Sequence, residues 1–241
     1  MDWNVALCIS GHLRTYQHCI DSHVKNLLSV LSPDVFIHTW NQTEASGHQN
    51  QSKSRRVNSD DIRLLEEKYS PVSFQVETQH YKDRGNLPCG HAKSAHYYTA
   101  KGMDSVYRDM KRHESETGVE YDLIVRLRQD ILITNRITDE YKQIKDIEDL
   151  YYGNVSWNGP VPTTDTILQK WHNYRVLDCF NFSTKKTAPY IFNAYSQIDQ
   201  YLSKPAFRHD PFLDFALDNG VVPVISDDFV FDRDWSIRRY G

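Results

Sequence analysis

The sequence predicts an α/β domain with a parallel sheet in its first half and a mixed arrangement of strands and helices in its second half. Short apolar runs, typical of buried strands, alternate with amphipathic segments of helical periodicity in the first half. The length of 241 residues suits one large domain. No internal repeat and no linker rich in Pro, Gly or Ser divides the chain. We therefore expect a single domain.

A β-α-β unit opens the chain. Residues 5–9 form an apolar run that predicts a buried strand, which ends at Ser10-Gly11. Apolar side chains at helical spacing predict a helix over residues 20–31, and residues 34–38 predict a second buried strand. Units of this kind favour parallel strands joined by a right-handed crossover.

The alternation of strands and helices continues after a polar interruption. Residues 41–58 contain almost no apolar side chain and predict a surface loop, which is long enough to close over a bound ligand. The following elements are expected in order: a helix over 59–69, a strand over 72–76, a helix from 93 to about 110, and strands over 122–127 and 131–133.

The second half is less regular. Residues 176–182 alternate and predict a strand, and residues 221–225 predict a last core strand. Between these strands, residues 189–202 and 211–217 predict amphipathic helices, and Asn219-Gly220 ends the second of them.

Composition excludes several classes of protein. A net charge of −4 provides no basic footprint for nucleic acid or an anionic membrane. No apolar run approaches the roughly 20 residues of a membrane span, and the N-terminus has no signal-peptide pattern. The four cysteines form no CxxC pair, which argues against structural zinc and for a reducing compartment such as the cytoplasm. The motifs of P-loops, dinucleotide-binding turns, HExxH metalloproteases and GxSxG hydrolases are absent.

The turn after the first strand is the first candidate site. Ser10 and Gly11 end the strand, and a glycine allows the backbone to approach a ligand closely. A helix N-terminus, which favours anions, is expected next, and Arg14 can bind phosphate through two parallel hydrogen bonds. The alternative is an ordinary strand-to-helix turn with a surface arginine.

A second candidate site lies at the end of the strand over 122–127. Arg126, Arg128 and Asp130 occupy alternate positions, so they share one face if the segment is extended. Charges at the end of a buried strand are costly unless they are paired or bind a ligand. Asp130 is of the type that binds Mg²⁺ or Mn²⁺, and the arginines are of the type that neutralises a pyrophosphate. The alternative is an internal salt bridge from Arg126 or Arg128 to Asp130.

Three segments together resemble one branch of the GT-A glycosyltransferases, found in bacteria and large DNA viruses. Residues 10–16 read SGHLRTY, residues 34–40 read DVFIHTW, and residues 121–130 read YDLIVRLRQD. The motifs appear in the same order as in that branch. The resemblance implies a nucleotide-sugar-binding half over residues 1–134 and an acceptor-binding half over residues 135–241.

The resemblance also implies roles for individual residues. Asp130 takes the place of the last acidic residue of a DxD motif, which ligates Mn²⁺ or Mg²⁺ at the donor diphosphate. Arg128 stands where the first aspartate of that motif would be, so it either replaces part of the charge of the cation or orients Asp130. Lys93 opens a helix where such enzymes place a basic residue for the donor; the alternative is an exposed lysine at a helix start.

Asp210 corresponds to the position of a carboxylate that accepts the proton of the acceptor hydroxyl. The alternative is a helix N-cap, because Pro211 follows it. The acidic residues between 227 and 234 provide either a further metal ligand or a solvated tail.

The implied activity is the inverting transfer of a sugar from a UDP-, GDP- or dTDP-linked donor to a hydroxyl of a glycan acceptor. A retaining transferase, a non-catalytic nucleotide- or carbohydrate-binding module and a nucleotidyl- or phosphotransferase are the alternatives.

Overall fold

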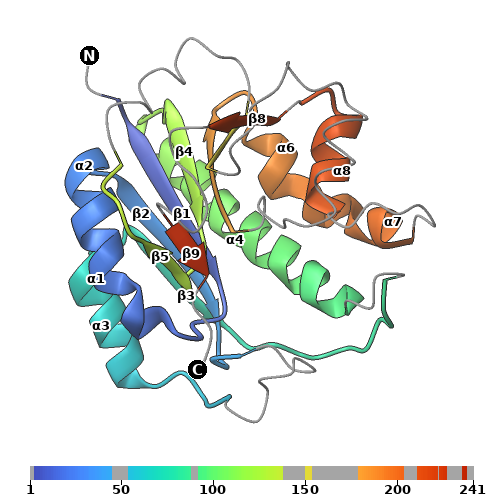
Figure 1. Ribbon diagram of the computed structural model, residues 1–241, viewed down its shortest axis with the longest axis horizontal. Coiled ribbons are helices and arrows are strands. Elements are labelled where there is room, and N and C mark those ends of the chain that lie inside the picture. The colour runs from blue at the N-terminus through green and yellow to red at the C-terminus, as the bar shows by residue number, and fades with distance from the viewer. Residues whose placement is uncertain are drawn as a thin grey trace.

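The computed structural model describes most of the chain, and the description that follows is confined to this part (Figure 1). The described ranges are 3–44, 54–87, 92–137, 150–153, 179–203, 211–221, 223–226 and 235–237.

A seven-stranded mixed sheet forms the centre of the molecule, with the strand order β3-β2-β1-β4-β7-β6-β8. The strands β3, β2, β1 and β4 run parallel, whereas β7 is antiparallel to both β4 and β6, and β6 is parallel to β8. This arrangement confirms the predicted α/β class, with a parallel first half and a mixed second half. The seven strands of this sheet are β1 (Val5–Gly11), β2 (Asp34–Trp40), β3 (Ser73–Glu77), β4 (Leu123–Leu127), β6 (Leu150–Gly153), β7 (Phe180–Thr184) and β8 (Pro223–Ser226).

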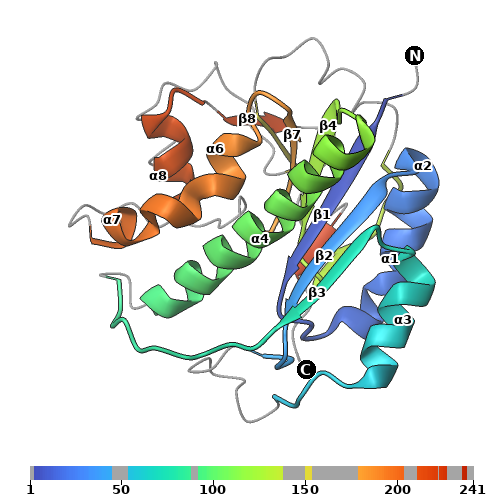
Figure 2. The same cartoon turned by 180° about the vertical axis from the view of Figure 1, so that it is seen from behind.

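The longest helix, α4 (Lys93–Thr117), packs on β1 and β2 and crosses the face of the sheet that is seen in Figure 2. Its apolar side chains repeat at helical spacing and include Met103, Val106 and Met110, all buried. Gly102 permits the close approach, because a Cβ there would lie 3.2 Å from Nδ1 of His38 on β2. The helix ends at Gly118, whose φ of 77° is left-handed.

The remaining helices form two groups. The helices α1 (Ile20–His23), α2 (Ser29–Leu31) and α3 (Ser59–Tyr69) lie together beside the parallel strands (Figure 1). The second group consists of α6 (Pro189–Phe192), α7 (Ile198–Ser203) and α8 (Pro211–Asp218), which contact one another near α4. No helix of the described ranges is long and apolar enough to cross a bilayer.

Two predicted helices are interrupted in the structure. The segment 20–31 contains a π-helical stretch, η2 (Val24–Leu28), between α1 and α2. The segment 189–202 contains a 3₁₀ stretch, η6 (Asn193–Gln197), between α6 and α7. Apolar periodicity detects the buried face of such segments but not a local change in winding.

A small second sheet was predicted only in part. Residues 131–133 form β5 (Ile131–Ile133) as expected, but its antiparallel partner β9 (Trp235–Ile237) was not predicted. The strand β6 was also missed. Both missed strands are short, with four and three residues, which is too short for an alternating pattern to stand out.

Candidate functional site

The candidate site lies at the carboxyl ends of β1 and β4. These neighbouring parallel strands pair up to Ile9 and Leu127. From β1 the chain builds the sheet outward to β2 and β3, whereas β4 lies on the opposite side of β1. The strand order therefore reverses between β1 and β4, and ligands of open α/β sheets bind beyond the carboxyl ends of strands at such a reversal.

The turn after β1 has an unusual backbone. Gly11 has a φ of 134°, and a Cβ there would lie 3.2 Å from Oε1 of Gln129. Arg14 has a φ of 48°, a left-handed conformation that costs a non-glycine residue about 1 kcal/mol. Its backbone N–H donates to the carbonyl oxygen of Thr43 over 2.7 Å. The turn is thus held in a strained form that directs the side chain of Arg14 toward β4.

Arg14, Arg128 and Asp130 meet at this edge. Nη1 of Arg14 donates to Oδ2 of Asp130 over 3.0 Å. Arg128 donates through Nε to Oδ1 over 2.9 Å and through Nη2 to Oδ2 over 2.7 Å. The exposed side-chain fractions are 14% for Arg14, 11% for Arg128 and 1% for Asp130. The two candidate motifs, far apart in the sequence, therefore form one site in which the two arginine side chains are slightly exposed and the carboxylate is buried.

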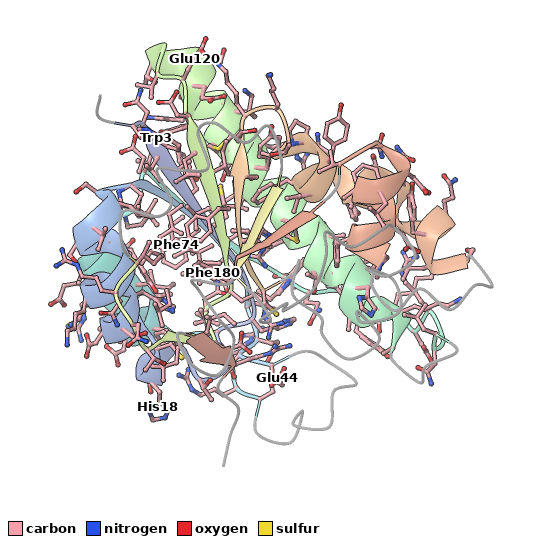
Figure 3. All side chains as sticks on the ribbon, turned by 45° about the horizontal axis from the view of Figure 1, so that its top comes forward. Trp3, His18, Glu44, Phe74, Glu120 and Phe180 are labelled. Atoms are coloured by element: carbon pink, nitrogen blue, oxygen red, sulfur yellow. The ribbon has the colours of Figure 1, made fainter. Side chains whose placement is uncertain are left out.

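A second carboxylate completes this cluster. Nε of Arg14 donates to Oε1 of Glu44 over 2.9 Å, and the side chain of Glu44 is buried. In Figure 3, Glu44 lies at the end of the molecule opposite Glu120, which lies three residues before the start of β4. We call Arg14, Glu44, Arg128 and Asp130 the arginine–carboxylate cluster. Its two positive and two negative charges balance, as burial requires.

Arg126 and Ser10 lie deeper than the cluster. The guanidinium of Arg126 is fully buried, donates through Nη2 to the carbonyl oxygen of Ser10 over 2.8 Å and also donates to that of Leu127. Ser10 is fully buried as well. Of the two salt bridges considered from the sequence, the one from Arg128 to Asp130 is present. Arg126 joins the ends of β1 and β4, and contact of Arg126 or Ser10 with a donor stays a prediction.

Lys93 is placed at the start of α4, as expected. Its backbone N–H donates to the carbonyl oxygen of Gly85 over 2.9 Å, and no described hydrogen bond joins its side chain to the arginine–carboxylate cluster. Asp210, the predicted base, lies outside the described residues, and so do the acidic residues between 227 and 234. The stems of the predicted loop over 41–58 pair with each other, because Gln42 bridges Arg56, whereas residues 45–53 are not among those described.

The described residues do not fit a divalent cation bound by Asp130. Among them, no group of three or more His, Cys, Asp or Glu side chains is arranged to hold a metal ion. Both oxygens of Asp130 accept hydrogen bonds from guanidinium groups. A cation bound through Oδ2 would have to displace the hydrogen bonds that this oxygen accepts from both arginines.

A neighbouring polar cluster was not assigned from the sequence, although the segment DVFIHTW contains one of its members, His38, and the adjoining Trp40. Nε2 of His38 lies 3.1 Å from Oε2 of Glu77, and Nζ of Lys101 pairs with Oε1 of Glu77. The Lys101 ammonium lies 5.5 Å from the centroid of the Trp40 ring. The hydrogen bond from His38, followed by the contact with Lys101, lowers the pKa of Glu77 to about 2. We call His38, Glu77 and Lys101 the edge cluster.

The segment that follows Asp130 is fixed by side chains of the α1–η2 region. Nε2 of His23 lies 2.5 Å from the carbonyl oxygen of Ile131, and Nδ1 lies 2.5 Å from the hydroxyl of Tyr69. Nδ2 of Asn26 donates to the carbonyl oxygen of Ile133 over 2.6 Å. Burial lowers the pKa of His23 to about 4, so the ring is neutral near pH 7. These contacts hold β5 and, through it, the position of Asp130.

Comparison with known proteins adds little to this geometry. No protein-family model and no curated protein matches the chain. Among solved structures, a nucleoside-diphosphate-sugar pyrophosphorylase from Vibrio cholerae RC9 is similar at a TM-score of 0.45 and 11% sequence identity, over 96% of this chain and 93% of that chain. A similarity at this level establishes neither a family nor an activity.

Proposed function

We propose that this protein is a glycosyltransferase that uses a nucleoside-diphosphate sugar as its donor and a hydroxyl of a glycan as its acceptor. The observation that carries the proposal is the convergence of Arg14 and Arg128 on Asp130 at the reversal of strand order, beside the turn at Gly11. Guanidinium groups match the geometry of phosphate oxygens, and this edge of an α/β sheet is where nucleotides bind.

In the proposed reaction, the acceptor oxygen attacks the anomeric carbon while the bond from that carbon to the diphosphate breaks. The nucleoside diphosphate leaves with the additional negative charge, which the guanidinium groups of Arg14 and Arg128 stabilise. The acceptor proton passes to a general base, and Asp210 is the predicted base for a transfer with inversion.

Donor binding is the first test. A thermal-shift screen of UDP-, GDP- and dTDP-sugars, each with Mn²⁺ and with EDTA, identifies the nucleotide that stabilises the protein. A ligand at a hundredfold excess over its Kd stabilises the folded state by about 2.7 kcal/mol. The absence of a shift with every donor in both conditions would contradict the proposal.

Product analysis separates the alternative functions. A glycosyltransferase releases an intact nucleoside diphosphate, whereas a nucleotidyltransferase releases pyrophosphate. A binding module shows the thermal shift but no turnover with any acceptor. Asp210→Ala abolishes turnover in an inverting enzyme that uses this base and leaves substantial turnover in a retaining one.

A further inference from the structure

We infer that Arg14 and Arg128 bind the donor diphosphate without a divalent cation, and that Asp130 positions these two arginines instead of ligating a metal. The inference rests on the proposed function, because it assumes that the ligand is a nucleoside diphosphate.

The hydrogen bonds of Asp130 favour a positioning role. Arg128 binds its carboxylate through two parallel bonds of 2.9 and 2.7 Å, and Arg14 adds a third bond of 3.0 Å to Oδ2. Two-point pairing of this kind fixes the plane of a guanidinium group. To ligate a cation through Oδ2, Asp130 would have to lose bonds to both arginines. Its present partners therefore explain its burial without a metal.

The exposed fractions of the three side chains also agree with a positioning role for Asp130. The guanidinium-bearing side chains are 14% and 11% exposed, whereas the carboxylate is 1% exposed. A ligand that approaches from solvent meets Arg14 and Arg128 before Asp130. This order suits a dianionic group such as a diphosphate and is the reverse of what a cation needs.

The arginine at position 128 also supports the binding of a diphosphate without a cation. The resemblance to DxD enzymes places an acidic residue here, and this chain has an arginine. Its Nη1 lies 3.0 Å from Sγ of Cys179, the buried residue that immediately precedes β7. The guanidinium is thus held from two sides, by Cys179 and by Asp130. A fixed positive charge replaces part of the charge that the ion would supply.

Calorimetric titration of the wild-type protein with UDP, GDP and dTDP tests the inference. Each nucleotide is titrated in excess EDTA and again in excess MnCl₂. We expect one of them to bind with Kd values that agree within about threefold in the two buffers. Binding that is more than about threefold tighter with Mn²⁺ overturns the inference and leaves the proposed function standing. The absence of binding in both buffers contradicts the proposed function itself.

Variants identify the groups that carry the binding. Arg14→Gln and Arg128→Gln each remove a charge-assisted hydrogen bond to phosphate, and we expect each to weaken binding in EDTA by about tenfold or more. Arg63→Gln is the matched control, because it makes the same charge change at a side chain that is 77% exposed on α3. Arginine variants that bind as tightly as this control overturn the inference.

Asp130→Asn separates positioning from metal binding. The amide lacks the negative charge that pairs with both guanidinium groups, so a positioning role predicts binding that is about tenfold weaker in EDTA and in MnCl₂ alike. A loss of affinity in MnCl₂ alone is the result expected of a metal ligand and overturns the inference. Asp21→Asn, at a side chain that is 79% exposed, controls for the charge change. If the Asp130 variant does not fold, electron paramagnetic resonance of Mn²⁺ with the wild-type protein and nucleotide gives the answer. Protein-bound Mn²⁺ that depends on the nucleotide overturns the inference, and its absence supports it.

Discussion

The arginine–carboxylate cluster and the edge cluster lie at the same end of the sheet but hold their charges differently. In the first cluster, Asp130 and Glu44 are buried and two arginines pair with them. In the second, Glu77 is 33% exposed, and its cationic partner Lys101 is 28% exposed. Solvent screens the second set of charges and hardly reaches the first. We therefore expect the folded state to depend more strongly on the pairing in the first cluster than on the pairing in the second.

Deleting one carboxylate from each cluster should show this difference most clearly. Asp130→Ala removes the buried carboxylate that pairs with both Arg14 and Arg128, and we expect a loss of about 3–5 kcal/mol in the free energy of unfolding. Glu77→Ala removes a screened pair and should cost about 1 kcal/mol or less. Urea unfolding followed by circular dichroism measures both. Equal losses would show that burial does not distinguish the two clusters.

The parallel half of the fold and the pairing of the two motifs were predictable for a physical reason. Strands buried on both faces, such as residues 5–9, are continuous apolar runs, and runs of this kind are visible in one sequence. Both motifs follow a buried strand, and the carboxyl ends of parallel strands lie at the same edge of a sheet, so the sequence places Arg14 and Asp130 at one edge. That β1 and β4 are neighbours at this edge comes from the structure. Contact of Arg14 with Glu44 was not predictable, because it depends on how a polar loop returns to the sheet.

The sequence also left the roles of Arg126 and Arg128 undecided. Both follow the same alternating pattern and differ by two positions, yet Arg126 is fully buried and Arg128 reaches the surface. The difference arises because β4 ends at Leu127, so only the first of the two arginines lies within the sheet. The predicted strand over 122–127 ends at the same residue, but the alternating pattern placed both arginines on one face and did not separate the side chain within the sheet from the one beyond it.

His23, which holds the segment after Asp130, and Glu77 of the edge cluster should lose their contributions to stability in different acidic pH ranges. Burial lowers the pKa of His23 from 6.5 to about 4, so the unfolded chain binds the additional proton first. The stability that the neutral ring contributes is complete above pH 6.5 and falls as the pH falls from 6.5 to about 4. Glu77, with its pKa lowered from 4.5 to about 2, contributes stability that is complete above pH 4.5 and is lost between pH 4.5 and 2.

The variant His23→Gln tests the pH range from 6.5 to about 4. The variant should lose the part of the pH dependence between 6.5 and 4 that this residue causes, about 3 kcal/mol at most for a shift of this size. Its stability at pH 7 should also fall, because β5 loses a hydrogen bond from the ring. Urea unfolding at a series of pH values gives both quantities. A pH profile for His23→Gln that is identical to that of the wild-type protein would refute the assignment.

The smallest expected effect is a change in the affinity for the nucleoside diphosphate when a carboxylate of either cluster is neutralised. Glu44 pairs with Arg14 and therefore competes with a phosphate for the same guanidinium. Glu44→Gln removes that competing charge, so we expect the nucleoside diphosphate to bind about two- to fivefold more tightly in calorimetric titrations. Glu77→Gln makes the same change in the edge cluster, where the described ion pairs of Glu77 are with His38 and Lys101, and should leave the affinity unchanged within error. Tighter binding by the Glu77 variant alone would place the diphosphate at the carboxyl end of β3 and away from the turn at Gly11.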